Sequence, residues 1–163
     1  MTTEHGGHFC GDLVNRDLVD RDLVDRDLVD RDDIERLVRD FYRQAAMDDL
    51  LGPVFAAAEM NWNAHIDTLV AFWEWQLLGC PGYGGQPLRA HEPVHARTPL
   101  THAHYARWVE LFCDTVDGLF AGPNAEVAKG RGRKMAAAME RLLAGVSAEG
   151  DVPIEPLWRG ADR

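Results

Sequence analysis

The sequence predicts an all-α protein. Apolar residues recur at helical spacing, for example at Ile34, Leu37 and Phe41, and residues three, four or seven positions apart share one face of a helix. No segment shows the alternation of apolar and polar residues that is typical of a half-buried strand. Glycine-proline pairs at positions 52–53 and 122–123 separate the helical segments, because both residue types interrupt helices.

Length and charge narrow the class of protein further. A chain of 163 residues with 46% hydrophobic residues is enough for one packed domain. The 17 Lys and Arg against 27 Asp and Glu give a net charge of −10, which argues against nucleic acid or an anionic membrane as the main partner. With no apolar run of about 18 residues for a membrane span and no secretory signal pattern, the cytoplasm is the expected location.

A five-residue repeat occupies residues 12–31, which read DLVNR and then DLVDR three times. A period of five spreads the leucines around a helix and sends them to alternate faces of a strand, so neither element gains an apolar side. Asp and Arg recur four residues apart, a spacing that supports a solvated helix weakly. We therefore expect residues 1–31 to be a low-complexity extension, flexible or helical, with a partner-binding arm as the alternative.

Two helices are expected in the first half of the folded part. The first begins with Asp32 as N-cap and Glu35 as the capping-box acid, and it ends at Leu51-Gly52-Pro53. The second runs from about Met60 to Leu78 and is apolar over most of its circumference, so it should be buried against two neighbours. A glycine-rich loop follows at 79–85, and residues 86–95 contain two prolines without helical periodicity, which predicts an irregular segment.

Two further helices complete the predicted domain. One begins at Thr98-Pro99, a good cap followed by proline in the first helical position, and it ends before residues 122–123. The last runs from about Lys134 to Leu143, since Gly130 and Gly132 weaken any earlier start. The tail 146–163 contains two prolines and is expected to be loose. The domain thus covers residues 32–145.

Histidines and aromatic residues are the candidates for chemistry, because nucleotide-binding, hydrolase and zinc-protease motifs are all missing from the sequence. His65 lies on an apolar helical face, and His91 lies just after the glycine-rich loop. Taken alone, each imidazole is more often an ordinary histidine than a ligand. Two histidines that face an apolar, aromatic space would however suit a planar iron cofactor.

Five ordered motifs resemble the group III truncated haemoglobins, a family of short bacterial globins. The match extends over about residues 32–145, and the motifs lie at spacings compatible with the family. They are Phe41-Tyr42, Leu51-Gly52-Pro53-Val54-Phe55, Trp62-Asn63-Ala64-His65 with Phe72-Trp73, the stretch YGGQPLRAH from Tyr83 to His91, and Trp108-Val109-Glu110-Leu111-Phe112.

The resemblance implies a two-over-two helical sandwich around haem b, and it assigns roles to residues of this chain. His91 would be the proximal ligand of the iron and the only metal ligand. A distal cluster of hydrogen-bond donors would face the bound gas, and it comprises Tyr42, His65 and Trp108. Four residues would form the pocket wall, namely Phe41, Leu69, Phe72 and Trp73. Tyr83 and Arg89 would meet the haem propionates.

The expected function is reversible binding of dioxygen and other diatomic gases. Detoxification of nitric oxide or peroxide is expected as a further role. The protein is expected to be a monomer. Two alternatives stay open at this point. One is a haem-based gas or redox sensor that acts through a redox partner, with residues 1–31 as its contact arm. The other is a helical interaction module without a cofactor.

Overall fold

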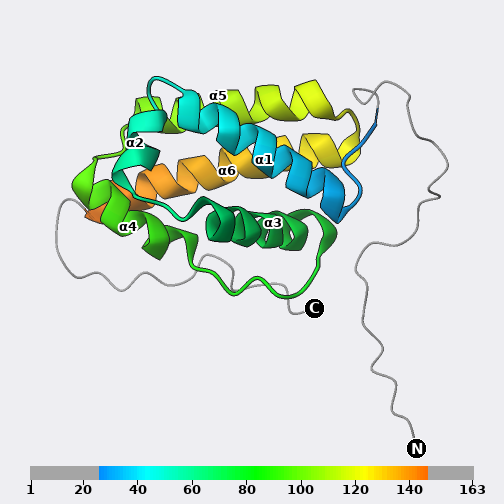
Figure 1. Ribbon diagram of the computed structural model, residues 1–163, viewed down its shortest axis with the longest axis horizontal. Helices are drawn as coiled ribbons and strands as arrows, with labels where there is room; N and C mark the ends of the chain where they lie inside the picture. Colours follow the sequence, from blue (N-terminus) through cyan, green and yellow to red (C-terminus); the bar gives the residue numbers. More distant parts are fainter. Residues whose placement is uncertain (1–25, 147–163) are drawn as a thin grey trace, which may run out of the picture.

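The computed structural model describes residues 26–146, which contain six α-helices and no strand (Figure 1). The prediction of an all-α fold is confirmed. The expectations for residues 1–25 and for the tail from 147 lie outside this described part. The helices are α1 (Arg31–Met47), α2 (Gly52–Ala57), α3 (Trp62–Leu78), α4 (Pro87–Arg97), α5 (His102–Leu119) and α6 (Pro123–Val146).

Four long helices form two packed pairs. α1 packs against α3, α5 packs against α6, and the two pairs meet where α1 contacts α5 and α3 contacts α6. The short helices α2 and α4 lie together at one end of the molecule (Figure 1), where they contact each other and α4 also contacts α6. This is the two-over-two sandwich of a truncated globin, as the sequence predicts.

A stack of three aromatic rings joins α3 to α5. Phe112 lies between Trp73 and Trp108, with ring centroids 4.9 Å and 5.0 Å apart and interplanar angles of 14° and 11°. Phe41 from α1 meets Phe112 edge-on at 5.4 Å. Phe41, Phe112 and Trp73 are at most 2% exposed, and each buried side chain of this size contributes about 1.5–3 kcal/mol of hydrophobic stabilisation.

The first helix begins two residues earlier and ends sooner than predicted. Its N-cap is Asp30, whose carboxylate accepts from the Asp33 amide at 2.9 Å, because the fully buried Leu28 holds the preceding chain against the core. At the other end Asp48 accepts from the amides of Leu50 and Leu51, both at 3.0 Å. These local bonds compete with helix formation and explain the turn before α2.

The N-terminus of α5 also differs from its predicted position at Thr98-Pro99. The helix is capped by Thr101, whose backbone N–H donates to Nδ1 of His104 at 3.1 Å. The side chains of Thr101 and His104 form a reciprocal capping box, which satisfies donors that the helix itself leaves free. Thr98 instead ends α4, where its amide donates to the Val94 carbonyl at 2.8 Å.

The prediction of an irregular segment at 86–95 is wrong, because α4 spans this region. Pro87 occupies the first turn, where its missing N–H costs nothing, whereas Pro93 lies inside the helix and removes one backbone hydrogen bond. Packing compensates: α4 contacts α2 and α6, and the buried His95 accepts from the Leu100 amide at 3.1 Å. Tertiary contacts, rather than local pattern, make this segment helical.

The prediction that the last helix begins near Lys134 is also wrong, because α6 continues through both glycines. A Cβ atom at Gly132 would lie 2.9 Å from Cδ1 of Phe112, closer than real Cβ contacts. Glycine at 132 therefore permits the close approach of α6 to α5. The packing of these two helices offsets the free energy that a glycine costs inside a helix, about 1 kcal/mol. No neighbour lies within 4 Å of a Cβ at Gly130.

The two glycines of α6 provide a matched pair of variants. We expect Gly132→Ala to lower the free energy of unfolding by about 1–3 kcal/mol through overpacking, because Phe112 is held between two tryptophan rings. Gly130→Ala should raise it by about 0.5–1 kcal/mol. Urea denaturation measures both values, and equal effects of the two substitutions would contradict this account of α5–α6 packing.

Candidate functional site

A cavity of about 220 Å³ lies among the six helices of the described residues. Most of its lining is apolar, which suits a hydrophobic ligand. The polar groups that border it include three of the predicted site residues, His91, His65 and Tyr42. Its apolar wall includes Val54, Phe55, Leu69, Phe72, Trp73, Val94, Leu100, Met135 and Met139.

His91 on α4 presents an imidazole with a defined tautomer. Its Nδ1 lies 2.7 Å from the carbonyl oxygen of Pro87, four residues earlier. Because a carbonyl oxygen only accepts hydrogen bonds, Nδ1 carries the proton and the lone pair is on Nε2. The ring borders the open cavity, and surrounding protein atoms lower the pKa of His91. The neutral form, with a lone pair available for a metal, is thus favoured.

Tyr42 and Trp108 form a hydrogen-bonded pair between α1 and α5. The indole N–H of Trp108 donates to the hydroxyl of Tyr42, and both residues line the cavity. Burial raises the pKa of the Tyr42 phenol, so it stays protonated at physiological pH. Since the Tyr42 oxygen accepts from Trp108, its own proton is available for a third group.

His65 on α3 completes the predicted polar cluster. Its ring meets that of Tyr42 at a centroid distance of 5.5 Å with the planes at 90°. Burial lowers the pKa of His65, and positive charge on His91 lowers it further. The two imidazoles border the same cavity from different helices and are close enough to repel each other when charged.

The predicted pocket wall is only partly at the cavity surface. Leu69, Phe72 and Trp73 line the cavity. Phe41 instead lies behind it, where its ring packs edge-on against Tyr42 at 4.7 Å and Trp108 at 5.1 Å. Phe41 therefore supports the polar cluster from the core side.

The two residues expected at the haem propionates lie in different places. Tyr83 borders the cavity and packs edge-on against Phe72 at 5.2 Å; burial raises the pKa of its phenol. Arg89 is exposed on α4 and does not contribute to the cavity lining within the described residues. Of this pair, the structure brings only Tyr83 to the site.

The acceptor for His91 is the functional group that the sequence analysis missed. Pro87 precedes His91 by four residues, which is the spacing of neighbours on a helix. A helix prediction for residues 87–97 would have identified this carbonyl. The proline-rich composition and the missing periodicity concealed it.

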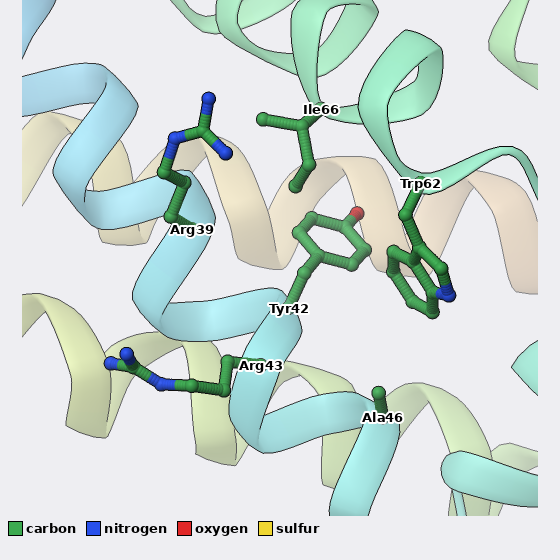
Figure 2. Close-up of a pocket in the computed structure, with 6 residues that line it drawn as sticks. All are labelled: Arg39, Tyr42, Arg43, Ala46, Trp62 and Ile66. Atoms are coloured by element: carbon green, nitrogen blue, oxygen red, sulfur yellow. The ribbon is translucent and has the colours of Figure 1, made fainter.

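A second hollow of about 280 Å³ lies on the outer side of Tyr42 (Figure 2). Figure 2 shows the Tyr42 ring between Ile66 and Trp62 of α3, with two arginines of α1 beside it. Both arginines form ion pairs on their own helix, Arg39 with Glu35 and Arg43 with Asp40. Tyr42 borders both the hollow and the cavity, so its ring separates the cavity from this part of the surface.

The cavity fits haem by the chemistry of its groups. His91 offers a single lone pair at the border of the cavity, which suits a metal whose other ligands come from a macrocycle. The apolar wall suits the porphyrin, and Tyr42, His65 and Trp108 place polar groups beside the space left for a small ligand. Such a site has the features that a haem-binding helical protein requires.

Comparison with known proteins agrees with this class. The chain matches the bacterial-like globin family over residues 28–141 and belongs to that family. It is 26% identical over 114 residues to the group 3 truncated hemoglobin ctb of Campylobacter jejuni, covering 68% of this chain and 87% of the relative. The crystal structure of the group III truncated hemoglobin from Campylobacter jejuni superposes with a TM-score of 0.65 at 25% identity, over 73% of this chain and 94% of that chain.

The helices of the described part give no indication of membrane insertion: none of them combines the length and the apolar character that crossing a bilayer needs.

The lowered pKa values of His65 and His91 predict a loss of stability in acid. Their folded-state pKa lies below the ordinary value of 6.5, so the unfolded chain binds protons first as pH falls. The free energy of unfolding of the haem-free protein should therefore decrease from about pH 6.5 down to the folded-state pKa. His65→Leu should make this decrease shallower in urea titrations.

The control for this measurement is His102→Gln, since the His102 side chain is 83% exposed. It should leave the pH dependence unchanged. An identical slope for wild type and His65→Leu would refute the half-buried, uncharged state of His65.

Proposed function

We propose that this globin binds haem b in the cavity and reversibly binds dioxygen and other diatomic gases. The observation that carries the proposal is the arrangement of one cavity bordered by the lone pair of His91 and by the polar cluster of Tyr42, His65 and Trp108. The family, which is described as bacterial-like globins, and the named relatives, which are hemoglobins by their descriptions, support it.

His91 would hold the haem through Nε2. The Pro87 carbonyl keeps the proton on Nδ1 and fixes the plane of the ring, and such a hydrogen bond also makes the other nitrogen a stronger donor to the metal. Phe72 and Trp73 from α3 and Met135 and Met139 from α6 would contact the faces and edges of the porphyrin. Tyr83 is the candidate for contact with a propionate.

When bound, haem supplies the iron that accepts an electron pair from a diatomic ligand. The chain supplies the groups that retain the ligand. Trp108 donates to the Tyr42 oxygen, which directs the Tyr42 proton away from Trp108 and leaves it free to donate to a partly negative ligand. His65, kept neutral by burial, can donate a second hydrogen bond.

The hydrogen bonds of this cluster favour a high affinity for dioxygen. A buried bond to a charged acceptor contributes about 1.5–3 kcal/mol, which corresponds to about tenfold or more in an equilibrium constant. Detoxification of nitric oxide or peroxide belongs to the same proposal, because these reactions also use a ligand polarised by neighbouring donors. The same proposal includes a monomeric state, a location in the cytoplasm and a redox partner that reduces the haem iron.

The first test is the absorption spectrum of the purified chain after haem supply. The proposal predicts a Soret band that shifts when carbon monoxide is added to the ferrous protein. His91→Ala should abolish or strongly alter this spectrum, whereas His95→Ala should destabilise the fold without removing the metal ligand. A chain without a Soret band, or one unaffected by His91→Ala, would overturn the proposal.

The second test concerns the Tyr42 proton. Tyr42→Phe removes one charge-assisted hydrogen bond, so dioxygen should dissociate about tenfold or more faster in stopped-flow measurements. Tyr105→Phe is the matched control, because Tyr105 also lines the cavity while its hydroxyl is enclosed by protein and has no partner among the described residues. An unchanged dissociation rate in Tyr42→Phe would mean that Tyr42 does not bind the ligand.

A further inference from the structure

The last copy of the five-residue repeat is built into the globin domain. Residues 26–31, here named the clasp, run from the end of the extension to the first residue of α1. The Asp27 carboxylate accepts from the backbone amides of Asn124 at 3.0 Å and Ala125 at 2.9 Å. These amides belong to the first turn of α6, so the clasp provides the cap of a helix that is almost 100 residues away in sequence.

Leu28 anchors the centre of the clasp. Its side chain is 0% exposed and belongs to the main core, and its carbonyl accepts from Nδ2 of Asn124 at 2.8 Å. Gly122 makes room for this contact: its φ is +146°, and a Cβ there would lie 2.5 Å from Cγ of Asp27. A residue with a side chain at 122 would therefore exclude the clasp.

Charged contacts fix both ends of the clasp. The guanidinium of Arg26 pairs with the buried carboxylate of Asp33, which also accepts from the amide of Val29 at 3.0 Å. Asp30 is the N-cap of α1, and Arg31 pairs with the buried Glu74 of α3. The domain thus recognises the order Arg-Asp-Leu-Val-Asp-Arg through almost every side chain of the segment.

This hexapeptide occurs three times in the chain, at residues 16–21, 21–26 and 26–31. The three copies are identical, so every contact of the side chains at 26–29 is chemically available to the copy that precedes it. The one difference is covalent: only the last copy continues directly into α1.

We propose that the clasp site is a binding site for the repeat unit, and that residues 21–24 are its second occupant within the same chain. In this shifted register, residues 21–24 take the places of 26–29. Asp30 stays the N-cap of α1, because it is bonded to Arg31, and residues 25–29 form a loop of five residues before it. Leu23 then fills the core position of Leu28, and Asp22 caps α6.

The energetic order of the two registers follows from this geometry. The shifted register keeps the same side-chain contacts but closes an additional loop, which costs entropy. The direct register therefore predominates in the intact chain. When the last copy is damaged, the preceding copy becomes the better occupant, because a segment tethered a few residues away has an effective concentration of the order of millimolar. A second molecule at ordinary concentrations does not compete with it.

Single and combined leucine substitutions in the full-length, haem-loaded chain test this proposal. The variants are Leu28→Asp, the pair Leu18→Asp with Leu23→Asp, and the triple variant. Two readouts are the unfolding equilibrium in urea and the hydrogen exchange of the Asn124 and Ala125 amides, which Asp27 protects directly. The pair is the matched control, because it adds the same kind of charge without touching the occupant seen in the structure.

The pair alone should behave as wild type in both readouts. The triple variant should shift the unfolding equilibrium by about thirtyfold or more, as expected for loss of a buried leucine, and should lose amide protection. Leu28→Asp alone should show a clearly smaller shift and retain part of the protection. If an aspartate variant does not fold, the same measurements are made with alanine at the same positions.

Equal effects of the single and triple variants would overturn the proposal, since the upstream copies would then give no rescue. A rescue that grows with protein concentration would also overturn it, because the occupant would then be a second molecule. Neither readout depends on which gas the haem binds, so failure here is distinct from failure of the proposed function.

Discussion

The stack of Trp73, Phe112 and Trp108 is the contact on which the arrangement of the site depends. It holds α3 against α5 at ring separations of 4.9 and 5.0 Å, and α6 reaches the same ring only because residue 132 has no side chain. The stack also fixes the orientation of the Trp108 indole, whose N–H then donates to Tyr42. Core packing and ligand chemistry therefore share one set of aromatic residues.

On the α4 side of the cavity, a backbone group rather than aromatic packing orients the functional side chain. The carbonyl of Pro87 determines the tautomer of His91. Both residues lie on α4, which contains an internal proline. Such a helix is weak by itself and is maintained by its contacts with α2 and α6. The proposed metal ligand is thus carried by the element whose structure depends most on its neighbours.

The extension and the domain are joined more closely than the repeat pattern indicates. The repeat pattern predicts a boundary at residue 31, whereas the match to the globin family begins at residue 28, and Leu28 lies in the core. Asp27 and Arg31 connect this segment to α6 and α3, respectively. The repeat unit is a poor helix or strand former by its period, and in residues 26–31 it is held both by Asp33 nearby and by partners distant in sequence.

The sequence by itself determined the helical class and a long helix, predicted from about Met60 to Leu78, because both depend on local periodicity. Its short motifs, through the family resemblance, named polar residues that line the cavity. Only the tertiary structure decided that residues 87–97 form a helix, that α6 passes through Gly130 and Gly132, that Phe41 lies behind the cavity and that Arg89 lies outside it. The physical reason is common to these cases. Packing between distant segments can outweigh the free-energy cost of a proline or a glycine in a helix. It also determines which side chains reach the cavity.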